Sequence, residues 1–139
     1  MRIAAAAIIA AGLAACAQAP AETDWSGDRN FGAIGFADRV EATILHGSMG
    51  EAGLYAIRVR IPEGGTMPPH THPDDRMMTV LSGAVWYGFG DTVDVATAPL
   101  YQAGDFFLVP GGQPHYARAK SDVVYEEAGM GPSATTPLE

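Results

Sequence analysis

Three of the four histidines in this sequence are spaced so that they could share one metal ion. His70 and His72 are separated by one residue, and in an extended chain two such side chains point to the same face. Two neutral imidazoles on one face can hold a divalent metal once a neighbouring strand adds a third ligand. His115 follows the turn-forming segment VPGGQP, where the chain can reverse and bring this ring towards the first pair. The pattern predicts a three-histidine site, whereas His46 is expected at the surface or at a strand end.

The elements that must position these residues are short strands. Residues 54–61 alternate apolar side chains with Arg58 and Arg60, which is the period of a half-buried strand. Gly, Pro and Asp separate further strand-forming runs, and no segment after the N-terminal apolar run shows a sustained helical period. We therefore expect a sandwich or a barrel. The other predicted strands are residues 41–45, 77–82, 85–89, 105–109, 115–119 and 123–128.

Length and charge limit the range of functions. A chain of 139 residues with 47% hydrophobic content has room for one globular domain. Its 16 acidic residues against 8 basic ones give a formal net charge of −8. Because nucleic-acid binding needs a surface that neutralises phosphates, this balance argues against a nucleic-acid partner.

The N-terminus is typical of an export signal. Arg2 precedes an almost unbroken apolar run over residues 3–15, which is shorter than the about 20 residues that a membrane-spanning helix needs. The sequence LAAC at residues 13–16 resembles a bacterial lipobox. Cys16 is the only cysteine in the chain and has no disulfide partner, so we predict that it is lipidated. An ordinary signal-peptidase site at AQA, residues 17–19, is the alternative.

These features divide the chain into a signal peptide over residues 1–16, a polar tether over 17–30 and a folded domain over 31–139. We expect an exported protein, either periplasmic or anchored to a membrane as a lipoprotein, with secretion as the alternative. Contact with a membrane is expected only through the lipid.

Two spaced motifs surround the histidines and resemble those of the cupin family. The first spans residues 64–83 in the pattern G-x5-H-x-H-x3-E-x6-G, and the second spans 104–119 in the pattern G-x5-P-x-G-x2-H-x3-N. The resemblance implies an all-β, single-domain cupin, which is a double-stranded β-helix or jelly-roll barrel with a metal site inside. It also implies a homodimer, because family members often dimerise. The matching residues are Gly64, His70, His72, Gly83, Gly104, Pro110, Gly112 and His115.

Two positions depart from the motifs. Arg76 occupies the place of the family's glutamate ligand, and Ala119 replaces an asparagine that is not a ligand. Arginine stays protonated and has no lone pair for a metal, so the protein would supply only three histidines. We predict that Arg76 binds a substrate carboxylate, because a guanidinium pairs with carboxylates through two hydrogen bonds. The alternative is that Arg76 faces outward or forms a salt bridge with Asp74 or Asp75. Acids that could offset its charge are Asp74, Asp75 and Glu126.

The implied cofactor is one divalent metal ion (Fe, Mn, Cu, Ni or Zn), a choice that three imidazoles leave open. Cupins with three-histidine centres include dioxygenases, so the resemblance implies a small-molecule dioxygenase or related metalloenzyme acting on a ligand that carries a carboxylate. The alternative is a non-catalytic binding or sensing cupin whose degenerate site holds no metal and keeps its histidines for packing. Met77 and Met78 are expected to fill the core. The alternative is that one of their sulfur atoms serves as a soft fourth ligand to the metal.

Overall fold

Eleven short strands form nearly all of the regular structure in residues 30–139, the part of the chain that this computed structural model describes. No helix occurs among these residues, and so none that could cross a membrane. The predicted signal peptide, Cys16 and nearly all of the tether lie outside the described residues. The strands are β1 (Gly32–Ala33), β2 (Glu41–His46), β3 (Gly53–Ile61), β4 (Thr66–Thr71), β5 (Arg76–Ser82), β6 (Ala84–Phe89), β7 (Leu100–Gln102), β8 (Phe106–Val109), β9 (His115–Ala119), β10 (Val123–Gly131) and β11 (Thr136–Pro137).

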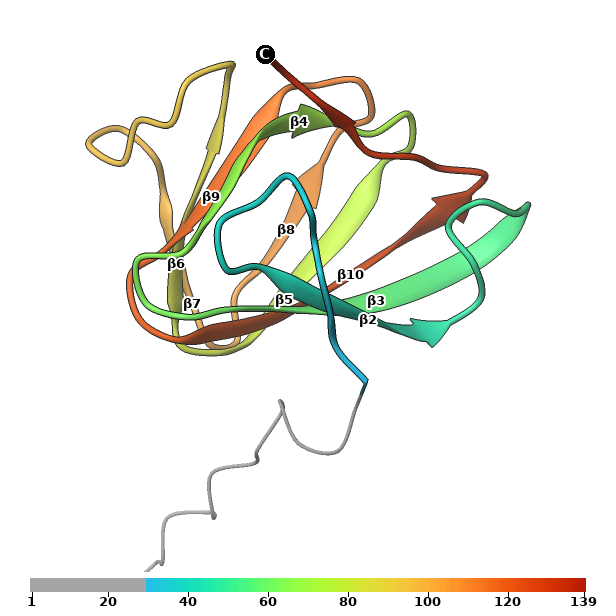
Figure 1. The fold of residues 1–139 in the computed structure, drawn as a ribbon, viewed down its shortest axis with the longest axis horizontal. Helices are drawn as coiled ribbons and strands as arrows, with labels where there is room; N and C mark the ends of the chain where they lie inside the picture. The colour runs from blue at the N-terminus through green and yellow to red at the C-terminus, as the bar shows by residue number, and fades with distance from the viewer. Residues whose placement is uncertain (1–29) are drawn as a thin grey trace, which may run out of the picture.

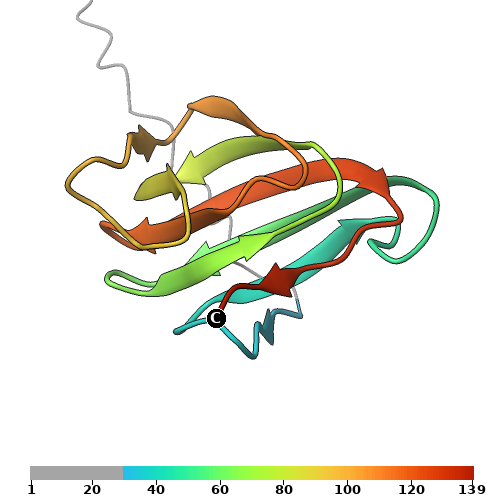
Figure 2. The ribbon, with the colours of Figure 1, turned by 90° about the horizontal axis from the view of Figure 1, so that it is seen from above.

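The strands form two antiparallel sheets that face each other. One sheet has the order β1-β2-β3-β10-β5-β8 and the other has the order β11-β4-β9-β6-β7. In Figure 1, β4 and β9 lie across the barrel from β2 and β3, and Figure 2 shows the C-terminal segment beside β4, to which β11 is hydrogen-bonded. The predicted all-β, single-domain jelly roll is confirmed.

Strand alternation explains which side chains fill the interior. In β3, Tyr55, Ile57, Val59 and Ile61 are buried, as the period of this segment predicts. Valines of β5, β6, β8 and β10 meet them from the other strands and complete an apolar core. This core holds the inward faces of both sheets in place around the polar groups at one end of the barrel.

All seven predicted strands are present, and their ends differ from the prediction by at most three residues. The prediction did not include β4 as a strand because Pro68 and Pro69 lie within it. Proline has no N–H for the ladder and is tolerated at bulges. The pairing of β4 with β9 is in fact irregular between Met67 and His70.

Candidate metal centre

Strand pairing brings the three predicted histidines together. His70 in β4 lies directly opposite His115 in β9, and their ring centroids are 4.3 Å apart. His72 follows the end of β4, with centroid distances of 4.8 Å to His70 and 5.2 Å to His115. One ring nitrogen from each residue can be chosen so that all three lie within 4.8 Å of one another. Because all three side chains are buried, they form a closed cluster that could hold a metal.

The turn before His115 is tied to the segment that carries His72. Gly112, at a φ of +75°, donates its N–H to the His72 carbonyl at 2.6 Å. Gly111 donates its N–H to Asp75 Oδ1 at 2.8 Å, and a Cβ on Gly111 would lie 2.6 Å from the Pro73 carbonyl oxygen. Only glycine permits this close approach of the two segments. The predicted reversal of the chain therefore occurs, and it brings His115 to the pair.

Backbone carbonyls determine which nitrogen of each histidine carries the proton. Nδ1 of His70 lies 2.7 Å from the Pro68 carbonyl oxygen, and Nδ1 of His115 lies 2.8 Å from that of Gln113. Nδ1 of His72 lies 2.9 Å from the carbonyl oxygen of Ala134. A carbonyl can only accept, so each Nδ1 must carry the hydrogen, and each Nε2 keeps its lone pair. This arrangement is typical of histidines that bind metals, and the donor set therefore fits a divalent ion.

Burial keeps the cluster neutral. Desolvation, followed by the charge of Arg76, lowers the pKa of His72 to about 3. Desolvation, followed by the neighbouring His70, lowers the pKa of His115 to about 4, and burial also lowers the pKa of His70. Neutral imidazoles are the form that binds a metal.

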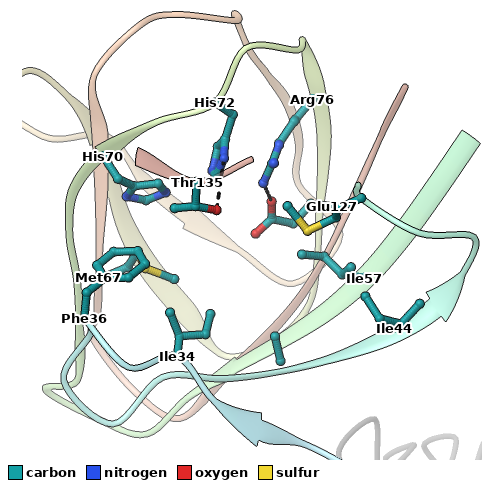
Figure 3. A pocket seen from close by; sticks show the side chains of 12 residues that line it. Ile34, Phe36, Ile44, Ile57, Met67, His70, His72, Arg76, Glu127 and Thr135 are labelled. Atoms are coloured by element: carbon teal, nitrogen blue, oxygen red, sulfur yellow. Dashed lines mark hydrogen bonds and ion pairs between the residues drawn. The ribbon is translucent and has the colours of Figure 1, made fainter. Parts of the chain in front are cut away.

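A cavity of about 210 Å³ adjoins the cluster. Figure 3 shows His70 and His72 on one side of it and the Arg76–Glu127 pair on another, with aliphatic and aromatic side chains below them. A small polar region within apolar walls is typical of a site for a small molecule. The lining residues are Ile34, Phe36, Ala42, Ile44, Met49, Ile57, Met67, His70, His72, Arg76, Glu127 and Thr135.

Arg76 faces the interior, where it is 1% exposed, so the outward-facing alternative is wrong, whereas the alternative of a salt bridge with Asp74 is confirmed. The chain bends after His72, and Arg76 begins β5 in the opposite sheet. Its Nη1 donates to Glu127 Oε2 at 2.6 Å, and its Nε lies 3.6 Å from Asp74 Oδ1. Its Nη2 donates to Ser133 Oγ at 3.0 Å. The chain itself therefore supplies two carboxylates to this guanidinium.

Of the three acids predicted to offset the charge of Arg76, only Asp74 does so. Asp74 does offset the charge of Arg76: burial would raise the pKa of Asp74, but hydrogen bonds from Ser133 and Tyr55 and the charge of Arg76 together lower it. Asp75 instead accepts a backbone N–H, and Glu126 faces outward against Arg58. The main partner, Glu127, was not predicted.

Of the site residues that were not predicted, Glu127 has a signal in the sequence and the C-terminal residues have none. Glu127 shares the parity of the buried Tyr125 within β10, so strict alternation would have placed it inside. The C-terminal residues Ser133 to Thr135 carry no motif, and only the return of the chain along β4 brings them to the site.

His46, the two methionines of β5 and Ala119 all lie outside the histidine cluster and the cavity lining. His46 ends β2 and is exposed, as expected. Met78 is fully buried in the core, whereas Met77 is 47% exposed and was wrongly expected in the core. Neither methionine lines the cavity. Ala119 is buried in β9 within the core.

Two curated relatives each match about half of this chain. Germin-like protein 3-1 from Oryza sativa subsp. japonica is 38% identical over 65 residues, which cover 46% of this chain and 29% of that protein. Nectarin-1 from a Nicotiana hybrid is 32% identical over 72 residues, which cover 51% of this chain and 31% of that protein. The matches thus span less than a third of either relative.

Solved structures show the same fold at low identity. The polyketide cyclase RemF from Streptomyces resistomycificus superposes with a TM-score of 0.68 at 15% identity, covering 81% of both chains. The DMSP lyase DddQ from Ruegeria pomeroyi superposes with a TM-score of 0.65 at 19% identity, covering 79% of this chain and 61% of that one. The Cupin_2 family, described as "Cupin domain", matches residues 57–126, half of the sequence. With this match, the two motifs and the barrel, the chain belongs to the cupin family.

Proposed function

We propose that this protein is an exported cupin that binds one divalent metal through His70, His72 and His115 and acts on a small molecule held in the adjoining cavity. The observation that carries the proposal is the orientation of the three rings. Each Nδ1 is engaged by a backbone carbonyl, which leaves three buried, neutral Nε2 atoms as ligands. A cluster kept only for packing would not need the same tautomer at all three positions.

The reaction class that we favour is oxygenation or a related metal-dependent conversion. A bound metal would supply Lewis acidity or redox chemistry, with Fe, Mn, Cu, Ni and Zn as the candidates. Arg76 cannot be a ligand, so positions would remain open for substrate. The residues of the chain would then hold the apolar part of the substrate between Met67, Ile57 and the wall formed by Phe36. The structural relatives named above include a cyclase and a lyase, so the fold does not choose the reaction.

A non-catalytic binding or sensing cupin is the second candidate, and one observation favours it. The residue in the place of the family's fourth ligand, Arg76, is held in a buried network with Glu127, Asp74 and Ser133. Such a network is well suited to a rigid binding site. Oxygen consumption by the metal-loaded protein with candidate substrates distinguishes an oxygenase from a binder. Under either candidate function we also propose that the protein is exported, is lipidated at Cys16 and forms a homodimer.

The experiment compares the melting temperatures of the wild type, His115→Ala and His46→Ala with and without each candidate metal. Metal should raise the melting temperature of the wild type, because a ligand that binds only the native state stabilises it. His46 is exposed and belongs neither to the histidine cluster nor to the cavity lining, so His46→Ala should respond as the wild type does. His115→Ala should lose the response. Equal responses of all three proteins would contradict the three-histidine site.

A further inference from the structure

The polar end of the cavity presents an unengaged acceptor. Glu127 uses Oε2 to accept from Arg76, and among residues 30–139 its other oxygen, Oε1, has no hydrogen-bond partner. Glu127 also lines the cavity, and Figure 3 shows the second oxygen pointing away from Arg76 towards the cavity interior. This oxygen is not among the fully buried polar atoms that lack a partner, so it has access to the cavity, where a water or a ligand can donate to it.

Two of the three nitrogens of the guanidinium at this end are by contrast already engaged. Nη1 and Nη2 of Arg76 donate to Glu127 and Ser133, whereas Nε is fully buried without a hydrogen bond, 3.6 Å from Asp74 Oδ1, and is not accessible from the cavity. With both carboxylates ionised, the three charged groups Arg76, Glu127 and Asp74 sum to −1. A carboxylate that entered the cavity would have to compete with these two built-in partners and would add a further negative charge.

Taking the proposed function as its basis, we propose that the cavity selects a small ligand with an apolar body and a hydroxyl or ammonium head group. The head group donates a hydrogen bond to Glu127 Oε1. The cavity volume of about 210 Å³ suits a body of one ring or a short aliphatic chain. For comparison, an apolar protein cavity of about 150 Å³ holds benzene. The opposite side of the same cavity carries His70 and His72, so a ligand bound to Glu127 lies next to the metal cluster.

The first experiment uses three probes with the same ring: cyclohexanol, cyclohexylamine and cyclohexanecarboxylate. Binding to the wild-type protein is measured at pH 7 by ligand-observed NMR titration, both with metal and after chelation. The alcohol or the amine should bind at least about tenfold more tightly than the carboxylate, which corresponds to about 1.4 kcal/mol. The stronger of the two identifies whether a neutral or a cationic donor is preferred. Preferred binding of the carboxylate would overturn the proposal and support Arg76 as the anchor.

The second experiment changes the acceptor itself. In Glu127→Gln, the amide oxygen should turn to the N–H of Arg76, because Arg76 can only donate, and the amide NH2 should then face the cavity. The preference between the two charged probes should therefore invert, with the amine losing about tenfold and the carboxylate gaining, whereas the alcohol can accept from the NH2 and should change little. Glu126→Gln makes the same chemical change on the neighbouring, outward-facing residue and should leave the preference as in the wild type. An unchanged preference in Glu127→Gln, with a native circular dichroism spectrum, would refute the role of Oε1.

Failure of the proposed function is distinguishable from failure of this inference. If no metal binds but the chelated protein still prefers the donor head groups, the cavity assignment holds and the metalloprotein assignment falls. If metal binds but the preference is absent or reversed, only the inference about the head group falls. Should Glu127→Gln fail to fold, the probe series on the wild type still decides the question.

Discussion

Replacing one member of the buried pair formed by Arg76 and Glu127 should lower the free energy of unfolding strongly, and replacing both should lower it much less than the sum of the two single changes. The two side chains are 1% and 9% exposed, with Nη1 and Oε2 2.6 Å apart. At this distance the attraction is about 6 kcal/mol for an effective dielectric near 20, and desolvation of both ions offsets much of it. Glu127→Leu would leave Arg76 with one carboxylate, Asp74 at 3.6 Å, and the hydroxyl of Ser133. We expect a loss of about 3 kcal/mol in the free energy of unfolding, at the low end of the values for half-broken buried pairs.

A double-mutant cycle measures this coupling by urea unfolding of wild type, Arg76→Leu, Glu127→Leu and the double variant. The double variant should lose far less than the sum of the single variants, because no buried charge of this pair is left uncompensated. A cycle on Arg60 and Glu41, a pair with 36% and 38% exposure across β3 and β2, is the control and should give at most about 1 kcal/mol. If the coupling between Arg76 and Glu127 were no larger than that of the exposed pair, the account of this network would be wrong.

Three further predictions address titration, the C-terminal segment and export. The folded-state pKa values of His72 and His115, about 3 and about 4, lie below the unfolded value of 6.5. As pH falls below 6.5, each of these two histidines should therefore lower the free energy of unfolding of the metal-free protein by up to about 1.4 kcal/mol per pH unit. A free energy of unfolding, measured with denaturant, that stays constant from pH 7 to 4.5 would contradict this. Deletion of residues 133–139 removes the Ala134 carbonyl that holds His72 and should weaken metal binding about 10- to 100-fold by calorimetry, whereas Thr135→Val, which keeps that carbonyl, should change it little. Cys16→Ala should move the protein from the membrane fraction to the soluble fraction without changing its fold, and unchanged fractionation would refute lipidation.

The sequence predicts much of the fold because the strands alternate in a regular way and the turns carry strong signals. The alternation in residues 54–61 gives the correct inward face of β3, and the glycines and prolines of residues 110–114 give the correct reversal. The histidine pair and His115 could be linked because both motifs keep their spacing. Strand β4 was harder to predict, since its two prolines interrupt the ladder and its pairing depends on a strand 44 residues later.

The electrostatic partners in the site could not be predicted as reliably, because they depend on which strands become neighbours. Arg76 lies opposite Gly129 of β10, and this pairing brings Glu127, two residues earlier, to the interior beside it. Nothing local to Arg76 in the sequence distinguishes Glu127 from Glu126. Ala134 and Thr135 reach His72 only because the C-terminal segment returns along β4, a contact over 62 and 63 residues of sequence.

The most direct test of the three-histidine centre is the metal content of the domain over residues 31–139, purified without a histidine tag and loaded with each candidate metal in turn. Inductively coupled plasma mass spectrometry should find close to one ion per chain for at least one metal. The same measurement on His115→Ala should find a small fraction of that amount, and His46→Ala should match the wild type. Absence of stoichiometric metal from the folded wild-type domain under every loading condition would contradict the account, and the cluster would then be one of packing and hydrogen bonding alone.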